Sequence, residues 1–403
     1  MRKFLIGICF ILILLSFALN NLGLFPLIIN VFSIFFLLLF AFNFKIILNL
    51  KNIISVISIY TCILLLLFYW KSNAAFDFNE FIRSFMIFMV YLIIFSVYFD
   101  NYQRISHKYY NIFIQIYKYF LIINFTIILA QFALKSTLNI PLVFPWQPTR
   151  IQRYAGIMSE PAHNAMIHIP LIFENRIIDR RFGVLMMTII ALLSASASFF
   201  IVYIFYLVLL AKDLKFRINN LLAIMVVILL VSLFFLSIDY NNLNLFKRLS
   251  RIGINDGSSF TRFYKGFVLF QNNDFVHNIL GDGLGNQIRS VNRYSGKYYI
   301  LVNLEGEMMS AIFANIFSYG IILAIAIYIF IYINVRKAHL EILFLFLILF
   351  SFYSGAGFSN YIFYNLFILT NLISSYAINK KGFNKDIQKT NWLLSFQKVR
   401  VEK

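Results

Sequence analysis

Long runs of apolar residues, separated by short polar breaks, occupy most of this chain. Stretches such as Ile11 to Leu15 and Phe35 to Phe40 are apolar at every position, so every side of a helix built from them is apolar. Runs of 15 to 25 apolar residues recur along the sequence, and about 20 helical residues cross a hydrocarbon core of about 30 Å. Membrane β-strands would instead show short segments of alternating polarity. The pattern therefore predicts an all-α polytopic membrane protein.

The polar breaks divide the apolar runs into twelve expected spans. They are placed at 4–19, 23–42, 53–70, 81–98, 112–134, 160–174, 182–194, 197–211, 219–238, 305–333, 341–354 and 358–378. The stretch from 182 to 211 allows either one long helix or two short ones that break around Ala195. Two short spans keep both Arg181 and Lys212 on the cytoplasmic side, as the positive-inside rule requires, and we therefore expect two.

The distribution of Lys and Arg predicts the orientation of these spans. Cytoplasmic loops carry an excess of basic residues, and this rule places both termini in the cytoplasm, together with Lys51, Lys337 and the basic tail 379–403. Residues 135–159 and 239–304 then form two outer loops, the second of which is large and precedes the last three spans. No repeat or linker divides the chain, so a single membrane domain over residues 1–403 is expected.

Composition excludes several other classes of protein. Apolar residues make up 61% of the chain and charged residues only 13%, whereas soluble domains carry roughly a quarter charged residues. The formal net charge is +19, and the basic residues that produce it lie between the spans. They form no basic patch with interleaved aromatic residues, so nucleic acid is not an expected partner. Cys9 and Cys62 both fall in expected spans. We expect them to be packing residues, and we expect neither a disulfide framework nor a metal site.

The first outer loop holds basic residues that oppose the charge rule. Arg150 and Arg153 lie in this short loop, where the positive-inside rule disfavours them. Outside a bacterial inner membrane, a lipid-linked pyrophosphate is an anion that such arginines could bind. Binding to lipid headgroups is the alternative.

The segment that joins this loop to the sixth span is the most informative for chemistry. Ser159 suits a helix N-cap, and Pro161 suits the first helical turn. Glu160 and His163, three residues apart, then share one helix face at the outer membrane edge. The helix can run only to about Phe173, and its free N–H groups favour an anion. An ordinary capped helix is the alternative interpretation.

The large outer loop contains further candidates. Arg251 belongs to a basic cluster, and Arg262 lies among Phe260, Phe263 and Tyr264. A guanidinium beside aromatic rings suits sugars and phosphates, although a salt-bridged loop arginine would show the same pattern.

The end of this loop carries glycines and two carboxylates. The string from Gly281 to Asn286 lacks the strand and helix of a nucleotide-binding motif, so we expect a tight turn at the surface with positive φ angles. Glu305 and Glu307 are expected at the outer interface. They would line the same cavity as Glu160 or remain interfacial carboxylates.

These features together resemble the O-antigen polymerase and ligase superfamily. The resemblance rests on the twelve expected spans, the large outer loop, and the segments Arg153-x-x-Gly156-x-x-x-Glu160-Pro161 and Ser259-Phe-Thr-Arg262, followed by Gly281-Asp-Gly-Leu-Gly285. It implies a GT-C-like membrane glycosyltransferase at the periplasmic face of the bacterial inner membrane. The implied partners are an undecaprenyl-diphosphate-linked oligosaccharide, membrane lipids and a chain-length regulator protein, and no cofactor or metal is implied.

The implied reaction polymerises lipid-linked repeat units into O-antigen or capsular polysaccharide. Cations must stabilise the leaving diphosphate, and a base must accept the proton of the acceptor hydroxyl. By the resemblance, Glu160 is the expected base, with His163 as the alternative. The residues expected to bind diphosphate or glycan are Arg150, Arg153, Arg251, Arg262, Glu305 and Glu307.

Two alternative functions belong to neighbouring classes. An O-antigen ligase, which transfers glycan to the lipid A core, usually bears a His-Asn pair before the span that follows the large loop, whereas this chain has Glu305 and Glu307 there. A flippase or other transporter would show two similar halves and charged residues within its spans. The expected spans are almost free of such charges, so the polymerase is favoured.

Overall fold

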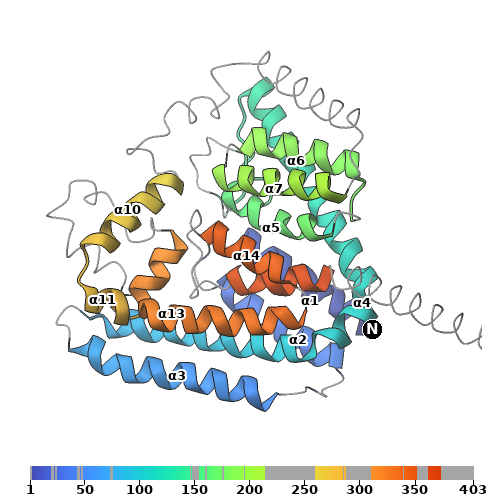
Figure 1. Cartoon of the computed structure of the whole chain (residues 1–403). Coiled ribbons are helices and arrows are strands. Elements are labelled where there is room, and N and C mark those ends of the chain that lie inside the picture. The colour runs from blue at the N-terminus through green and yellow to red at the C-terminus, as the bar shows by residue number, and fades with distance from the viewer. Residues whose placement is uncertain are drawn as a thin grey trace, which may run out of the picture.

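The computed structural model describes residues 2–19, 22, 25–42, 46, 49–72, 76–145, 147, 154–158, 161–174, 177–194, 196–213, 259–284, 286, 310–338, 340–351 and 362–373. Within these ranges the regular elements are all helices, and no strand occurs (Figure 1). The helices are α1 (Arg2–Ala18), α2 (Phe25–Phe42), α3 (Leu50–Lys71), α4 (Phe78–Leu138), α5 (Pro161–Phe173), α6 (Arg180–Ser194), α7 (Ala197–Asp213), α10 (Ser259–Asn272), α11 (Phe275–Leu280), α13 (Ala311–Lys337), α14 (Glu341–Ser351) and a last helix, Ile362–Ile373.

Among the residues that the structure describes, four helical stretches are long and apolar enough to cross a membrane. They are Leu50–Lys71, Phe78–Tyr102, Tyr109–Leu138 and Ala311–Lys337. The all-α membrane class is thus confirmed. The expected break between two short helices is also confirmed, because α6 ends at Ser194 and α7 begins at Ala197. The expected span 219–238 lies outside the described residues.

Apolar stripes on the outer surface show why lipid is the natural solvent of these helices. On α3, the exposed side chains Leu50, Ile54, Ile57, Leu65 and Phe68 recur at helical spacing along one face. The opposite face is buried against the rest of the protein. In water such a continuous apolar face would favour aggregation, whereas in a bilayer its contact with lipid carries no cost in free energy.

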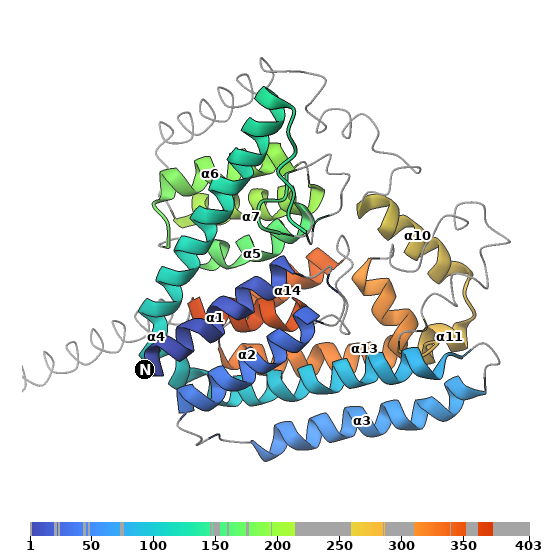
Figure 2. The same ribbon diagram turned by 180° about the vertical axis from the view of Figure 1, so that it is seen from behind.

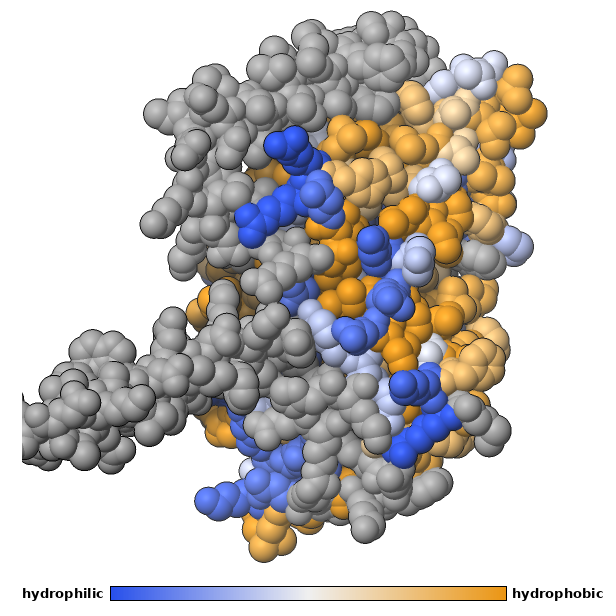
Figure 3. Space-filling view, turned by 90° about the vertical axis from the view of Figure 1, so that its right-hand side faces the viewer, coloured by the Kyte–Doolittle hydropathy of each residue, from blue (hydrophilic) through white to orange (hydrophobic). Residues whose placement is uncertain are grey.

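The end of the molecule nearest the N-terminus differs from this apolar surface. Figure 3 views the molecule from that side and shows hydrophilic residues gathered in a band beside a broad hydrophobic surface. Charged residues at a helix end and apolar residues along its sides are typical of spans that meet water at the membrane boundary.

Helix α4 is unusually long and changes direction. Its 61 residues begin at the N-cap Asp77, whose side chain accepts the backbone N–H groups of Asn79 and Glu80. They end at Asn139, which has a left-handed φ of 55°. Figure 2 shows one arm beside α3 and a second arm that leads away toward α6. The loop expected between spans 81–98 and 112–134 is therefore continuous helix.

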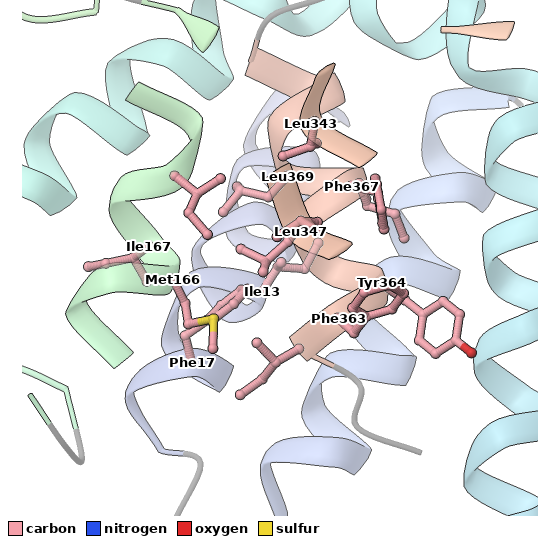
Figure 4. Packing of buried hydrophobic residues seen from close by; sticks show 14 of the residues in the cluster. Ile13, Phe17, Met166, Ile167, Leu343, Leu347, Phe363, Tyr364, Phe367 and Leu369 are labelled. Atoms are coloured by element: carbon pink, nitrogen blue, oxygen red, sulfur yellow. The ribbon is translucent and has the colours of Figure 1, made fainter. Parts of the chain in front are cut away.

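The core lies where the last helix packs against α1, α5 and α14. Figure 4 shows side chains of Ile13, Met166, Leu347 and Phe367 converging from these four helices. Tyr364 lies at the α4 side of this cluster, with its ring 5.9 Å from that of Tyr91. The last helix is buried on all sides, which fits a helix without a polar face.

A polar cluster, here called the Asp100 end, joins α3, α4 and α13. Asp100 accepts from Asn52 Nδ2 at 2.5 Å, from Lys337 Nζ at 3.2 Å and from the backbone N–H of Asn49 at 3.1 Å. Asn334 Oδ1 accepts from Asn52 and Lys337 as well. The Asp100 side chain is only 4% exposed, and a buried charge needs such partners.

The opposite end of α3, here called the Trp70 end, is fixed by two glycines. Trp70 Nε1 donates to the carbonyl of Gly281 at 3.1 Å. Gly281 and Gly320 have φ values of 76° and 75°, and a Cβ added to Gly281 would lie 2.5 Å from the backbone nitrogen of Gly320. A Cβ added to Gly320 would overlap the carbonyl of Ile279. Glycine alone combines this backbone angle with so close an approach.

This crossing changes two expectations. Gly320 is non-helical and kinks α13, so the span expected at 305–333 is not one straight helix. Positive φ angles are confirmed at Gly281 and Gly283, but the expected surface position of this turn is wrong. Gly281 to Leu284 and Asn286 are buried, because the turn is held beneath Trp70 and against the kink of α13.

Candidate functional site

The candidate site begins where the first outer loop enters α5. The helix starts at Pro161 and ends at Phe173, as the sequence predicts, and its 13 residues are too few to cross an average bilayer upright. His163 is half-buried in the first turn. Glu160 and Arg153 lie outside the described residues, on either side of the described segment 154–158.

The other predicted site residues are not brought together by the described part of the chain. Arg262 lies in α10, and only its backbone is described. The residues outside the described ranges are Arg150, Arg251, Glu305 and Glu307. Their assigned roles therefore stay predictions.

The segment 154–158 is a buried turn. Ala155 and Met158 are fully enclosed, and Gly156 between them has a φ of 64°. A Cβ at Gly156 would overlap the side-chain oxygen of Asn124. Because both the backbone angle and the space require glycine, the glycine of the Arg153-x-x-Gly156-x-x-x-Glu160 motif has a structural cause.

Four buried amide side chains, Asn124, Gln131, Gln147 and Asn164, bind the backbone of this segment, and we call them the amide cradle. Gln131 Oε1 accepts the N–H of Gly156 at 2.8 Å. Gln147 Nε2 donates to the carbonyls of Gly156 and Met158 at 2.8 and 2.7 Å. The turn lies in an apolar protein interior, where an unpaired backbone group would cost several kcal/mol.

The second half of the amide cradle connects α4 to α5. Asn124 Oδ1 accepts the N–H of Ile157 at 2.9 Å, and Asn124 Nδ2 donates to Asn164 Oδ1 at 2.8 Å. Asn164 Nδ2 in turn donates to the carbonyl of Ala155 at 3.0 Å. The segment is therefore held by α4 on one side and by α5 on the other.

His168 extends this polar region one turn deeper into α5. Its Nδ1 lies 2.6 Å from the carbonyl oxygen of Asn164, and its ring packs edge-on against Phe199 at 5.2 Å between centroids. Nε2 has no hydrogen-bond partner within the described part of the chain. The side chain is fully buried.

Tyr154 lines the entrance to the turn. Its backbone N–H reaches the carbonyl of Leu193 at 3.5 Å, which ties the segment to the end of α6. Burial raises the pKa of the Tyr154 phenol, and a hydrogen bond with Ser136 opposes this rise. Tyr154 is therefore neutral at physiological pH and acts as a hydrogen-bonding group rather than as a base.

The amide cradle was not predicted from the sequence. Asn124 and Gln131 are isolated polar residues within an apolar span, seven positions apart, which places them on one helix face. Asn164 continues the predicted Glu160 and His163 region by one residue. Amides recurring on one face of a span are a signal that could have indicated a buried polar contact.

The described residues include both cysteines and several possible metal ligands. No group of three or more His, Cys, Asp and Glu residues that could hold a metal ion occurs among the described residues. Cys9 is buried, as expected, but Cys62 is exposed on α3, so the prediction that it packs inside the protein is wrong. An exposed residue in a span faces lipid.

Comparison with known proteins adds no relative: no family model matches the chain, and no curated protein or solved structure shows significant similarity to it. The chain is a membrane protein by its helices. The residues around the turn before α5 are therefore the basis for any proposal about its chemistry.

Proposed function

We propose that this protein is a membrane glycosyltransferase that polymerises undecaprenyl-diphosphate-linked repeat units on the outer face of a bacterial inner membrane. The product would be O-antigen or capsular polysaccharide. The proposal includes twelve spans in a GT-C-like arrangement, cytoplasmic termini, and the Trp70 end on the outer side.

The observation that carries the proposal is the fixed turn before α5. The amide cradle holds residues 154–158 by hydrogen bonds between 2.7 and 3.0 Å. This segment lies between Arg153 and Glu160 in the sequence. These hydrogen bonds pair a buried backbone, and they also give the segment between Arg153 and Glu160 the fixed geometry that a site for a cation and a carboxylate requires.

The proposed chemistry divides between charge stabilisation and proton transfer. Arg153 and Arg262, assisted by Arg150 and Arg251, stabilise the diphosphate as it leaves the donor sugar. Glu160 accepts the proton of the acceptor hydroxyl, with His163 as the alternative base. The N-terminus of α5 adds the positive potential of the helix dipole.

A gel of the surface glycan from a strain without this protein, beside the complemented strain, tests the function. A polymerase predicts loss of the ladder, with a single repeat unit still attached to its anchor. Complete loss of attached glycan, with polymer still built on the lipid carrier, would indicate a ligase instead. Repeats trapped on the inner face would indicate a flippase.

Two variants test the site. We expect Glu160→Gln and Arg153→Ala to abolish the ladder without lowering the amount of protein in the membrane. Glu80 and Arg83 supply matched controls, because they form an exposed pair 3.6 Å apart near the start of α4. Glu80→Gln and Arg83→Ala should leave the ladder unchanged. Normal chain lengths in both site variants would contradict the assignment.

A further inference from the structure

The last helix begins with polar side chains that are buried without a protein partner. Tyr364 and Asn365 are both fully buried. Within the described part of the chain, the Tyr364 hydroxyl makes no hydrogen bond, and neither do the two polar atoms of the Asn365 amide. Native proteins pair nearly all buried polar groups with protein or with bound water, because an unpaired group costs free energy. These three atoms therefore indicate a bound partner.

The Tyr364 hydroxyl is directed away from the apolar core. Figure 4 shows the ring leaving the hydrophobic cluster, with its oxygen at the far end. The ring stacks on that of Tyr91 in α4, with 5.9 Å between the centroids and 13° between the planes. The oxygen thus lies on the side of the last helix that faces α4.

Tyr364 also lies near other phenols. It interacts electrostatically with the phenols of Tyr60 in α3 and of Tyr319 and Tyr328 in α13. The Tyr60 hydroxyl donates its proton to the carbonyl of Met89 at 2.7 Å. A hydroxyl has one proton and two lone pairs, so the Tyr60 oxygen keeps the capacity to accept a hydrogen bond. Two other helices therefore bring hydroxyl groups near Tyr364.

The depth of this site in the membrane determines which ligand suits it. Tyr60 is the eleventh of the 22 residues of α3, midway between the Asp100 end and the Trp70 end. A charged ligand at this depth needs a counter-charge, whereas Tyr364 interacts electrostatically with other tyrosines among the described residues. A neutral ligand that donates to Asn365 Oδ1 and accepts from Asn365 Nδ2 fits instead. Water is the smallest molecule that does both.

We propose that bound water molecules occupy this interior site, where they bond to the Tyr364 hydroxyl and to the Asn365 amide. The inference does not depend on the proposed glycosyl transfer. Tyr319 directly precedes Gly320, so the site lies beside the kink of α13. Water there supplies the hydrogen bonds that Tyr364 and Asn365 lack within the described part of the protein.

Radiolytic labelling of the full-length protein in detergent tests the proposal directly. An X-ray pulse converts water into hydroxyl radicals, which modify the side chains beside the water that forms them. Mass spectrometry should find Tyr364 modified although it is buried. Tyr117 is the matched control, because it is also fully buried but its hydroxyl donates to the carbonyl of Ile167, and it should stay unmodified. An unmodified Tyr364 would overturn the proposal. Equal modification of both tyrosines would overturn it as well, since water would then reach the whole interior.

Thermal unfolding of conservative variants gives an independent measurement. Tyr364→Phe keeps the ring on Tyr91 and removes only the hydroxyl. If that hydroxyl bonds to water, its loss should lower the Tm by about 2 °C, and Asn365→Leu should lower it too. Removing a hydroxyl that has no partner at all would instead leave the Tm unchanged or raise it. That result for Tyr364→Phe, in a protein where Tyr117→Phe lowers the Tm, would contradict the bound water.

Discussion

At the scale of single residues, Gly156 determines the path of the turn that leads into α5. Its φ of 64° and the overlap of any Cβ with Asn124 predict that Gly156→Ala lowers the free energy of unfolding by about 1–3 kcal/mol. Thermal unfolding in detergent should show a lower Tm, and the glycan ladder should be lost.

A second glycine serves as the control for this prediction. Gly7 lies within helix α1, and a Cβ there would meet the flexible end of Ile116 at 3.3 Å and Cγ2 of Ile112 at 3.8 Å, an ordinary contact distance. Gly7→Ala should change the stability little or raise it by up to about 1 kcal/mol, since alanine favours helix. Similar decreases of Tm in both variants would show that the angle at Gly156 is not the cause.

The sequence predicted this site only in part. The start of α5 at Pro161 and its end at Phe173 followed from capping and from the following Glu174, which are local signals. The amide cradle depends on contacts between residues up to 40 positions apart, such as Asn124 and Asn164. No local pattern encodes which backbone groups a buried amide will meet, so these partners became visible only in the fold.

At the scale of the helices, the Asp100 end depends on the pairing of α4 with α13. Removing one partner of a buried ion pair leaves a charge without compensation and costs about 3–5 kcal/mol. Lys337 is 32% exposed and Asp100 keeps two other donors, so Lys337→Met should cost less, about 1–3 kcal/mol. The measurement is the free energy of unfolding in a mild detergent.

A double-mutant cycle isolates this interaction. Asp100→Asn removes the charge but keeps an acceptor for Asn52. The combination Asp100→Asn with Lys337→Met should therefore recover most of the stability lost in Lys337→Met. If the two losses simply add, the contact between α4 and α13 does not depend on this pair.

The helices also show where hydropathy ceases to predict structure. An apolar run indicates that a segment lies in lipid. The bounds predicted from such runs are close to the observed bounds of α1, α2, α3 and α14. An apolar run does not indicate the kink at Gly320, because glycine within an apolar run is compatible with a straight helix. The kink lies where the end of α11 packs against α13. These two helices are far apart in the sequence, so no local pattern indicates their contact.

At the scale of the whole molecule, the two ends of α3 divide the protein into two sides. The Asp100 end gathers Asn49, Asn52 and Lys337, and the Trp70 end gathers the glycine crossing and the His277–Asp282 pair. A helix of 22 residues separates them, about 33 Å at 1.5 Å per residue. That length matches the hydrocarbon core, so α3 is long enough to place its two ends at opposite faces of a membrane.

This arrangement predicts which side each end faces. In a background with Cys9→Ala and Cys62→Ala, Ser72→Cys and Lys51→Cys place single exposed thiols at the two ends of α3. Because basic residues stay in the cytoplasm, a membrane-impermeant maleimide should label Ser72→Cys in intact spheroplasts and Lys51→Cys only after permeabilisation. The cysteine-free background is the control for unspecific labelling. The opposite result would place the Trp70 end in the cytoplasm, and the proposed polymerase orientation could then not stand.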